Sequence, residues 1–221
     1  MSLSQAVSNP DTAGFVLAGG RSSRMGQDKA FLELDGRPLI RHALDLLASA
    51  GLSATVAGAR SDLSRFAPVL EDSGEGPLSG ICSALAATSA QLAIFVPVDM
   101  PLLPAELLEA LIRQARIIGA LVTVSSINGY AETFPAVVHH SALPALEREL
   151  ASGRRGCFTA FEAAVRHAGQ AISIVPVEFL VQAGLVAHPM DLPAAFWFLN
   201  ANTPTDLAEV QVLLSVPHRV I

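Results

Sequence analysis

The chain has 221 residues, of which 51% are hydrophobic and 15% are charged, and its formal net charge is −6. This length suits a single domain, and the apolar fraction is sufficient for a sizeable core. The negative net charge argues against nucleic acid as a general partner, because nucleic-acid binding usually requires a basic face.

Short β-branched runs alternate with helical periods along most of the chain. Residues 1 to 12 are predicted to be loose, residues 13 to 214 to form one domain, and residues 215 to 221 to form a tail. We predict strands at 14–17, 53–57, 67–70, 92–98, 120–125, 135–139 and 171–177, and helices at 38–50, 79–89, 104–117, 141–151, 157–168 and 204–214. Such alternation is typical of βαβ units, so the sequence predicts an α/β fold with a mostly parallel central sheet flanked by helices.

Two of the predicted helices carry clear end signals. Pro38 is expected at the first position of a helix that ends before Gly51. Thr203 is expected to cap the last helix, with Pro204 at its first position and Asp206 in its first turn.

Two segments are unusually apolar. Residues 76 to 98 contain no charge, a length that would fit a membrane span. Glycines, prolines and several Ser and Thr interrupt them, which favours a helix and strand buried in an α/β core. Residues 178 to 198 are apolar but irregular and contain two prolines. We expect them to form a hydrophobic insertion or an oligomer contact rather than a sheet element.

The two cysteines, Cys82 and Cys157, lie far apart in the sequence, and no secretory signal precedes them. They are expected to be reduced core residues of a cytoplasmic protein.

The stretch LAGGRSSRMGQDKA, residues 17 to 30, combines three glycines with three cations directly after the first predicted strand. Gly19 and Gly20 can adopt positive φ and present backbone N–H groups as an anion-binding nest. Ser22 adds a hydroxyl donor. Ligands of open α/β sheets bind at this end of the strands, so the stretch predicts a site for phosphate.

Two cations of this stretch extend the predicted phosphate site. Arg24 can bind phosphate oxygens bidentately, and Lys29 supplies a compact charge. A glycine-rich turn with solvated cations is the alternative. The spacing matches neither the Walker A motif nor the G-x-G-x-x-G turn.

Asp99 is the best candidate ligand for a divalent cation. It follows the apolar run 93–98, so its carboxylate is expected at the same edge of the sheet as Lys29. Mg²⁺ is usually bound by one or two carboxylates together with phosphate oxygens. The alternative role, a cap for the helix near Pro104, would require a position closer to that helix.

The pattern LAGG-x-S-x-RMG-x-DK in residues 17 to 29 resembles the signature loop of the molybdenum cofactor guanylyltransferase family, and VPVDMPLL around Asp99 resembles its magnesium-binding motif. The resemblance implies a three-layer, Rossmann-like nucleotidyltransferase fold. It also implies that the triphosphate of GTP is held by Leu17, Ala18, Gly19, Gly20 and Lys29.

Residues 70 to 80, LEDSGEGPLSG, resemble the family element ED-x(n)-GPL-x-G, which implies that Asp72 helps to hold the nucleotide. On the residues alone, a simple acidic turn is equally consistent. The sequence departs from the family after the second strand, where Ala57 stands near the position of a nucleotide-binding asparagine.

The second substrate has weaker candidates. Arg154 and Arg155 could accept an anionic group, although a solvated helix end explains them equally well. Asn200 and Asn202, in LNANTP, resemble the family element N-x-NTP, which is associated with the pterin side. The alternative for Asn202 is a turn residue before the helix cap.

The resemblance implies that GMP is transferred from GTP to the terminal phosphate of molybdopterin, with release of pyrophosphate. Arg24, Lys29 and Asp99 would be catalytic, and Asp99 would bind Mg²⁺. The alternatives are transfer from CTP, whose enzymes carry LAAG, and a non-catalytic nucleotide-binding partner. Other molybdenum cofactor biosynthesis proteins and apo-molybdoenzymes are possible partners, but not nucleic acid or a membrane.

Overall fold

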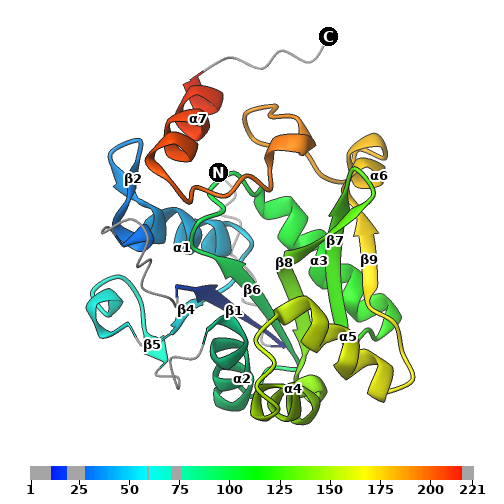
Figure 1. The fold of residues 1–221 in the computed structure, drawn as a ribbon. Coiled ribbons are helices and arrows are strands. Elements are labelled where there is room, and N and C mark those ends of the chain that lie inside the picture. Colours follow the sequence, from blue (N-terminus) through cyan, green and yellow to red (C-terminus); the bar gives the residue numbers. More distant parts are fainter. Residues whose placement is uncertain (1–10, 19–27, 59, 71–75, 216–221) are drawn as a thin grey trace, which may run out of the picture.

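The computed structural model describes residues 11–18, 28–58, 60–70 and 76–215. Its centre is a seven-stranded sheet in the order β5-β4-β1-β6-β8-β7-β9 (Figure 1). These strands are β1 (Thr12–Leu17), β4 (Ala54–Ala57), β5 (Val69–Leu70), β6 (Leu92–Pro97), β7 (Val122–Ile127), β8 (Tyr130–His139) and β9 (Ser173–Pro176). A separate small hairpin joins β2 (Glu33–Leu34) to β3 (Arg37–Pro38).

The sheet is mostly parallel, as predicted. β1 is parallel to both β4 and β6, β4 is parallel to β5, and β7 is parallel to β9. β8 is antiparallel to its neighbours β6 and β7. β7 and β8 are joined by Asn128 and Gly129, both at positive φ, as in the two-residue hairpin turns that favour Asn-Gly. The sequence prediction overlooked this turn signal and started β8 five residues late, at residue 135.

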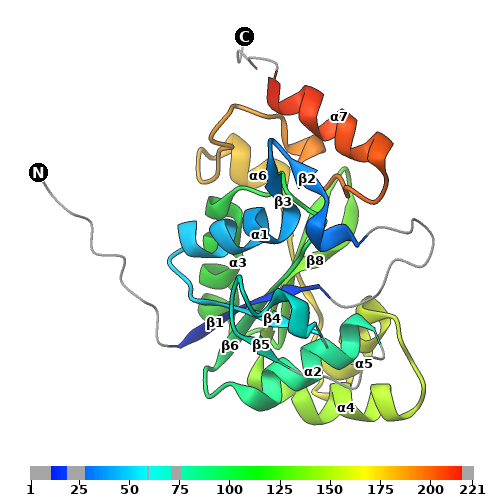
Figure 2. The ribbon, with the colours of Figure 1, turned by 90° about the vertical axis from the view of Figure 1, so that its left-hand side faces the viewer.

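Helices cover both faces of the sheet, which makes three layers (Figure 2). One hydrophobic core lies under α1, α3, α6 and α7, and a second lies under α2, α4 and α5. The helices are α1 (Leu39–Ser49), α2 (Pro77–Ala87), α3 (Ala105–Ile118), α4 (Leu143–Ala151), α5 (Cys157–His167), α6 (Val177–Gln182) and α7 (Pro204–Ser215). Short 3-10 turns lie at Lys29–Phe31, Ser61–Leu63, His140–Ala142 and Ala194–Phe196.

Element boundaries differ from the predictions where a local contact decides them. β1 begins at Thr12, inside the segment predicted to be loose, because Thr12 pairs with Leu92. α1 begins after Pro38, because the backbone of Pro38 is extended and pairs in the β2–β3 hairpin. α2 begins at Pro77, two residues early, since Gly76 takes the cap position at a φ of 93°.

The charge-free residues 76–98 form α2 and β6, as predicted. Within the part of the chain that the structure describes, every helix is too short or too polar to cross a membrane. Cys82 and Cys157 are free and buried in the core beneath α2 and α5. Burial raises the pKa of the Cys82 thiol to about 11 and that of the Cys157 thiol to about 12.

The apolar segment 178–198 contributes no strand, in agreement with the prediction, and its inner side is part of the core. Trp197 is 1% exposed, and its indole N–H donates a hydrogen bond to the carbonyl of Leu192 at 2.7 Å. The Ala187 amide donates to the Glu106 carboxylate of α3 at 2.7 Å. The segment therefore closes the α1/α3 layer, whereas an oligomer contact through its exposed side stays a prediction.

Replacement of Trp197 tests whether this segment is part of the cooperative core. We expect Trp197→Ala to lower the free energy of unfolding by about 3–5 kcal/mol, because it removes a fully buried aromatic ring. Phe179→Ala is the control, since Phe179 is 63% exposed and its loss should cost within about 0.5 kcal/mol. Urea unfolding followed by circular dichroism measures both, and equal losses would contradict a core role.

Candidate active site

The carboxyl ends of β1 and β6 lie side by side at one edge of the sheet. Leu17 pairs with Pro97, and the Val98 amide donates to the Leu17 carbonyl at 3.2 Å. On the other side of β1, the Ala18 amide donates to the Ala57 carbonyl of β4 at 3.3 Å. Residues that follow β1 and β6 in sequence therefore start from neighbouring points.

Lys29 lies at this edge, and it is the only lysine in the chain. Its ammonium donates to the Asp99 carboxylate at 2.9 Å and also to the side-chain oxygen of Asn202. The side chain of Lys29 is 28% exposed and that of Asp99 is 15% exposed, so the contact is partly shielded from water. Three segments that are distant in sequence thus meet at one cationic nitrogen.

A reciprocal cap at the start of α7 positions Asn202. The Asp206 carboxylate accepts hydrogen bonds from the amides of Asn202, at 2.9 Å, and Thr203, at 2.8 Å. In return, the Asp206 amide donates to the Thr203 hydroxyl at 3.1 Å, which confirms the predicted cap. The hydrogen bond from Thr203, together with the two amides and the charge of Lys29, lowers the pKa of Asp206.

The backbone joins the same segment to Asp99. The Ala201 amide donates to the Asp99 carbonyl at 2.8 Å. The carboxylate of Asp99 and the amide oxygen of Asn202 therefore approach the same point from two directions. Both are hard oxygen donors of the kind that Mg²⁺ prefers. The Lys29 ammonium occupies the point between them, so this pair fits a divalent cation once Lys29 has moved to another partner, such as a phosphate oxygen. Among the described residues, no group of three or more His, Cys, Asp or Glu side chains could hold a metal ion.

Gly19, Gly20, Ser22, Arg24 and Asp72 lie outside the described residues.

Leu17 and Ala18 are described, and both side chains are buried. Only their backbone groups can meet a nucleotide. The Leu17 carbonyl already accepts from Val98, and the Ala18 carbonyl accepts from Arg60. A carbonyl oxygen has two lone pairs, so each can accept one further hydrogen bond from a ligand.

The predicted residues of the second substrate site lie in different places. Asn202 contacts Lys29, whereas the Asn200 side chain donates to the nearby Phe198 carbonyl at 3.4 Å. Arg154 follows α4 and forms an ion pair with Glu149 at 2.5 Å. Arg154 lines a groove between α4 and α5, in the layer under α2, with a volume of about 530 Å³. The contacts of Arg154 are thus local to that layer.

Sequence reasoning gave no role to Arg60, which follows β4 and is 7% exposed. Its guanidinium contacts the Ala18 carbonyl and the carboxylates of Asp28 and Asp62. The available signal was a cation at the carboxyl end of a predicted strand, which is too common to identify a buried residue.

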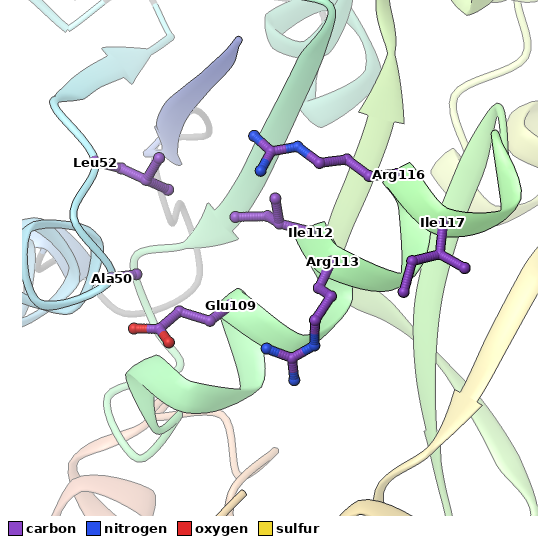
Figure 3. A pocket seen from close by; sticks show the side chains of 7 residues that line it. All are labelled: Ala50, Leu52, Glu109, Ile112, Arg113, Arg116 and Ile117. Carbon is purple, nitrogen blue, oxygen red and sulfur yellow. The ribbon is translucent and has the colours of Figure 1, made fainter. Parts of the chain in front are cut away.

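An apolar groove of about 420 Å³ lies elsewhere, between the end of α1 and α3 (Figure 3). It is lined by Ala50, Leu52, Glu109, Ile112, Arg113, Arg116 and Ile117. Arg116 donates to the hydroxyl of Thr12, the first residue of β1, at 2.7 Å. This groove therefore lies at the end of β1 opposite to Ala18.

Comparison with known proteins gives consistent matches. Residues 14–171 match the family of MobA-like NTP transferase domains. A molybdenum cofactor guanylyltransferase of Vibrio cholerae serotype O1 is 32% identical over 209 residues, which cover 92% of this chain and 93% of that protein. One from Xanthomonas euvesicatoria pv. vesicatoria is 50% identical over 101 residues, or 45% of this chain and 52% of that protein.

Among solved structures, molybdopterin-guanine dinucleotide biosynthesis protein A from Archaeoglobus fulgidus superposes with a TM-score of 0.74. It is 26% identical, and the match covers 92% of this chain and 98% of that chain. The likeness thus includes the carboxyl-terminal part of the chain, beyond the residues of the family match.

The cap at α7 makes a prediction about pH. Folding lowers the pKa of the Asp206 carboxyl. The ionised carboxylate therefore stabilises the folded protein fully at any pH above the pKa that Asp206 has in the unfolded chain. This stabilisation is lost as the pH falls through the pKa of Asp206 in the folded protein. Asp206→Asn should therefore lower Tm at pH 7, and the difference from wild type should shrink below about pH 4. The control is Glu209→Gln, which removes one negative charge from an exposed position of the same helix, α7, and should leave Tm nearly unchanged. A pH-independent difference for Asp206→Asn would contradict this role.

Proposed function

Since this chain belongs to the family of MobA-like NTP transferase domains, we propose that it transfers GMP from GTP to the terminal phosphate of molybdopterin. The observation that carries this proposal is the contact between Lys29 and Asp99, 2.9 Å long, at the carboxyl edge of the sheet. Lys29, the proposed phosphate-binding cation, lies beside Asp99, the proposed metal ligand, at the edge where open α/β sheets bind their ligands. The relatives named above are guanylyltransferases, which supports the same assignment.

In this proposal, the amides of Gly19 and Gly20 and the side chains of Ser22 and Arg24 bind the triphosphate. The base, rather than the triphosphate, lies against Leu17 and Ala18, because their carbonyl oxygens can accept hydrogen bonds from guanine N–H groups but offer no donor to phosphate. Asp72, which precedes α2 in the sequence, is expected to contact the nucleotide.

Asp99 would hold Mg²⁺, with the Asn202 side-chain oxygen close enough to contribute. When bound there, the ion would neutralise charge on the phosphate oxygens.

The reaction needs no covalent intermediate with the protein. An oxygen of the terminal phosphate of molybdopterin attacks the α-phosphorus of GTP, and the bond from this phosphorus to the bridging oxygen of pyrophosphate breaks. Lys29 and Arg24 stabilise the negative charge that grows on the departing pyrophosphate. Phosphoryl transfer asks little covalent chemistry of the protein, so positioning and charge neutralisation supply most of the rate.

For the pterin side, Asn202 is the best supported of the predicted residues, because it touches Lys29. Asn200 is two residues away on the same segment. Arg154 and Arg155 would need to reach the substrate from the loop after α4. We further propose that the product passes to other proteins of molybdenum cofactor biosynthesis or to apo-molybdoenzymes.

A second candidate is transfer from CTP, and one observation favours it. Ala57 occupies the position near which the family carries a nucleotide-binding asparagine, and Ala57 is 1% exposed, with its carbonyl engaged by Ala18. No side-chain amide reaches a nucleotide from this position. In favour of GTP, Gly19 lacks the methyl group present in LAAG, which leaves more room for a purine.

Substitution of Lys29 and Asp99 tests the proposed chemistry. We expect Lys29→Ala and Asp99→Asn each to reduce kcat for pyrophosphate release by at least about a hundredfold, because each removes a charge that acts on the phosphates. The assay contains GTP, Mg²⁺ and molybdopterin, and circular dichroism checks the fold.

The matched controls are Arg37→Ala and Asp45→Asn, which break an exposed ion pair between β3 and α1. Both should keep near-normal turnover. A Lys29 or Asp99 variant with near-normal release would refute the assigned roles. A wild-type protein that binds GTP tightly but releases no pyrophosphate would support the non-catalytic alternative.

Competition binding decides between the two nucleotides. We expect GTP to bind at least about tenfold more tightly than CTP, a difference of about 1.4 kcal/mol. Titration calorimetry with each nucleotide, in the presence of Mg²⁺, measures the two Kd values. A tenfold preference for CTP would reverse the assignment.

A further inference from the structure

We propose that Arg60 is a positioning residue for the reaction described above. It holds Ala18 and Asp28, the residues on either side of positions 19–27, and through Asp28 it keeps Lys29 in place against Asp99. The kinetic part of this inference rests on the proposed function, whereas the structural part does not.

The contacts of Arg60 use its whole guanidinium group. Nη1 donates to the Ala18 carbonyl at 3.2 Å and to the Asp28 carboxylate at 3.1 Å, and Nη2 lies 2.5 Å from the second oxygen of Asp28. Nε and Nη2 donate to the two carboxylate oxygens of Asp62 at 2.9 and 2.8 Å. A guanidinium has five N–H groups, and five acceptor atoms surround this one.

This saturation distinguishes a positioning role from direct phosphate binding. Every donor of Arg60 already has an acceptor, and two carboxylates more than neutralise its charge. The side chain is 8% exposed, and it lies over the ring of Phe31 at 5.8 Å. Arg60 therefore has no group left to offer an incoming phosphate.

Asp28 transmits this constraint to Lys29. The Asp28 carboxylate also accepts a hydrogen bond from the Ala30 amide at 3.0 Å and so caps the 3-10 turn that begins at Lys29. With Asp28 fixed by Arg60, the start of the turn is fixed, and the Lys29 side chain is directed at Asp99. An ammonium group cannot reproduce this arrangement, because it has three donors and lacks the planar fork.

The expected consequence is preorganisation of the nucleotide site. Without Arg60, GTP would have to order the turn at Lys29 when it binds, and this cost appears as weaker binding. Once GTP is bound, its phosphates hold Lys29, so kcat should change less than KM for GTP. An irreversibly unfolded fraction differs, because it lowers the apparent kcat and leaves KM unchanged. A reversibly unfolded fraction would raise the apparent KM, so circular dichroism must show that the Arg60→Gln sample is folded under the assay conditions.

The lone lysine allows a test that does not depend on activity. An amine-acetylating reagent at limiting dose can modify Lys29 and the terminal amine, and peptide mass spectrometry compares the two rates. We expect Arg60→Gln and Asp28→Asn each to speed the acetylation of Lys29, relative to the terminal amine, by about fivefold or more, because the turn opens more often. Asp28 and Asp62 are 31% and 50% exposed, so their carboxylates stay solvated and the Arg60 variant should fold.

Arg116→Gln is the matched control, because Arg116 binds the opposite end of β1 through Thr12. Its Lys29 acetylation rate should equal that of wild type. The double variant Arg60→Gln/Asp28→Asn should react no faster than the quicker single variant, since both remove the same contact. Acetylation of Lys29 in Arg60→Gln within twofold of wild type would overturn the inference, whatever the enzymatic activity.

Steady-state kinetics then test the functional part. For Arg60→Gln we expect KM for GTP to rise about tenfold, with kcat within threefold of wild type and KM for molybdopterin unchanged. An unchanged KM for GTP, or a loss confined to kcat, would overturn the positioning role. If wild type releases no pyrophosphate from GTP, the proposed function fails, and the acetylation rates still decide whether Arg60 holds Lys29.

Discussion

The contact of Lys29 with Asp99 and Asn202 is the interaction on which the site depends, because one ammonium group joins three separate parts of the chain. A buried or half-buried charge requires a partner, so each part must arrive at a fixed place. The parallel pairing of β1 with β6 brings Asp99 to the edge of the sheet beside the end of β1, and the hydrogen bonds of Asp28 hold the turn that carries Lys29. The cap at the start of α7 delivers the third.

The carboxyl-terminal part of the chain therefore contributes to the candidate site, through the contact of Asn202 with Lys29. Residues 178–198 pack against the α1/α3 layer through Trp197, and the chain then returns over the carboxyl edge, where Ala201 binds the backbone of Asp99. Figure 1 shows α7 above this edge. A segment whose sequence looks like an insertion thus packs into the core and leads into the residues that bring Asn202 to Lys29.

The two cations Lys29 and Arg60 have different proposed roles, which follow from the chemistry of their side chains. Lys29 has a compact charge on a flexible stem, and in the proposed function it exchanges the Asp99 carboxylate for a phosphate oxygen. Arg60 has a rigid fork with five donors, all engaged by Ala18, Asp28 and Asp62, which suits it to hold other residues in place. The net charge of the whole chain, −6, gives no indication of this local pair of cations.

The sequence by itself determined the alternation of strands and helices, the mostly parallel sheet and the cap at Thr203, because these features depend on hydrophobic periodicity and end signals within a few residues. It also indicated Lys29 and Asp99 as partners, through their places after two strands. Only the tertiary structure decided that Asn202 meets them, that Arg154 pairs with Glu149, and that Arg60 is buried. These contacts join residues far apart in sequence, and the path of the folded chain, which no local pattern encodes, brings them together.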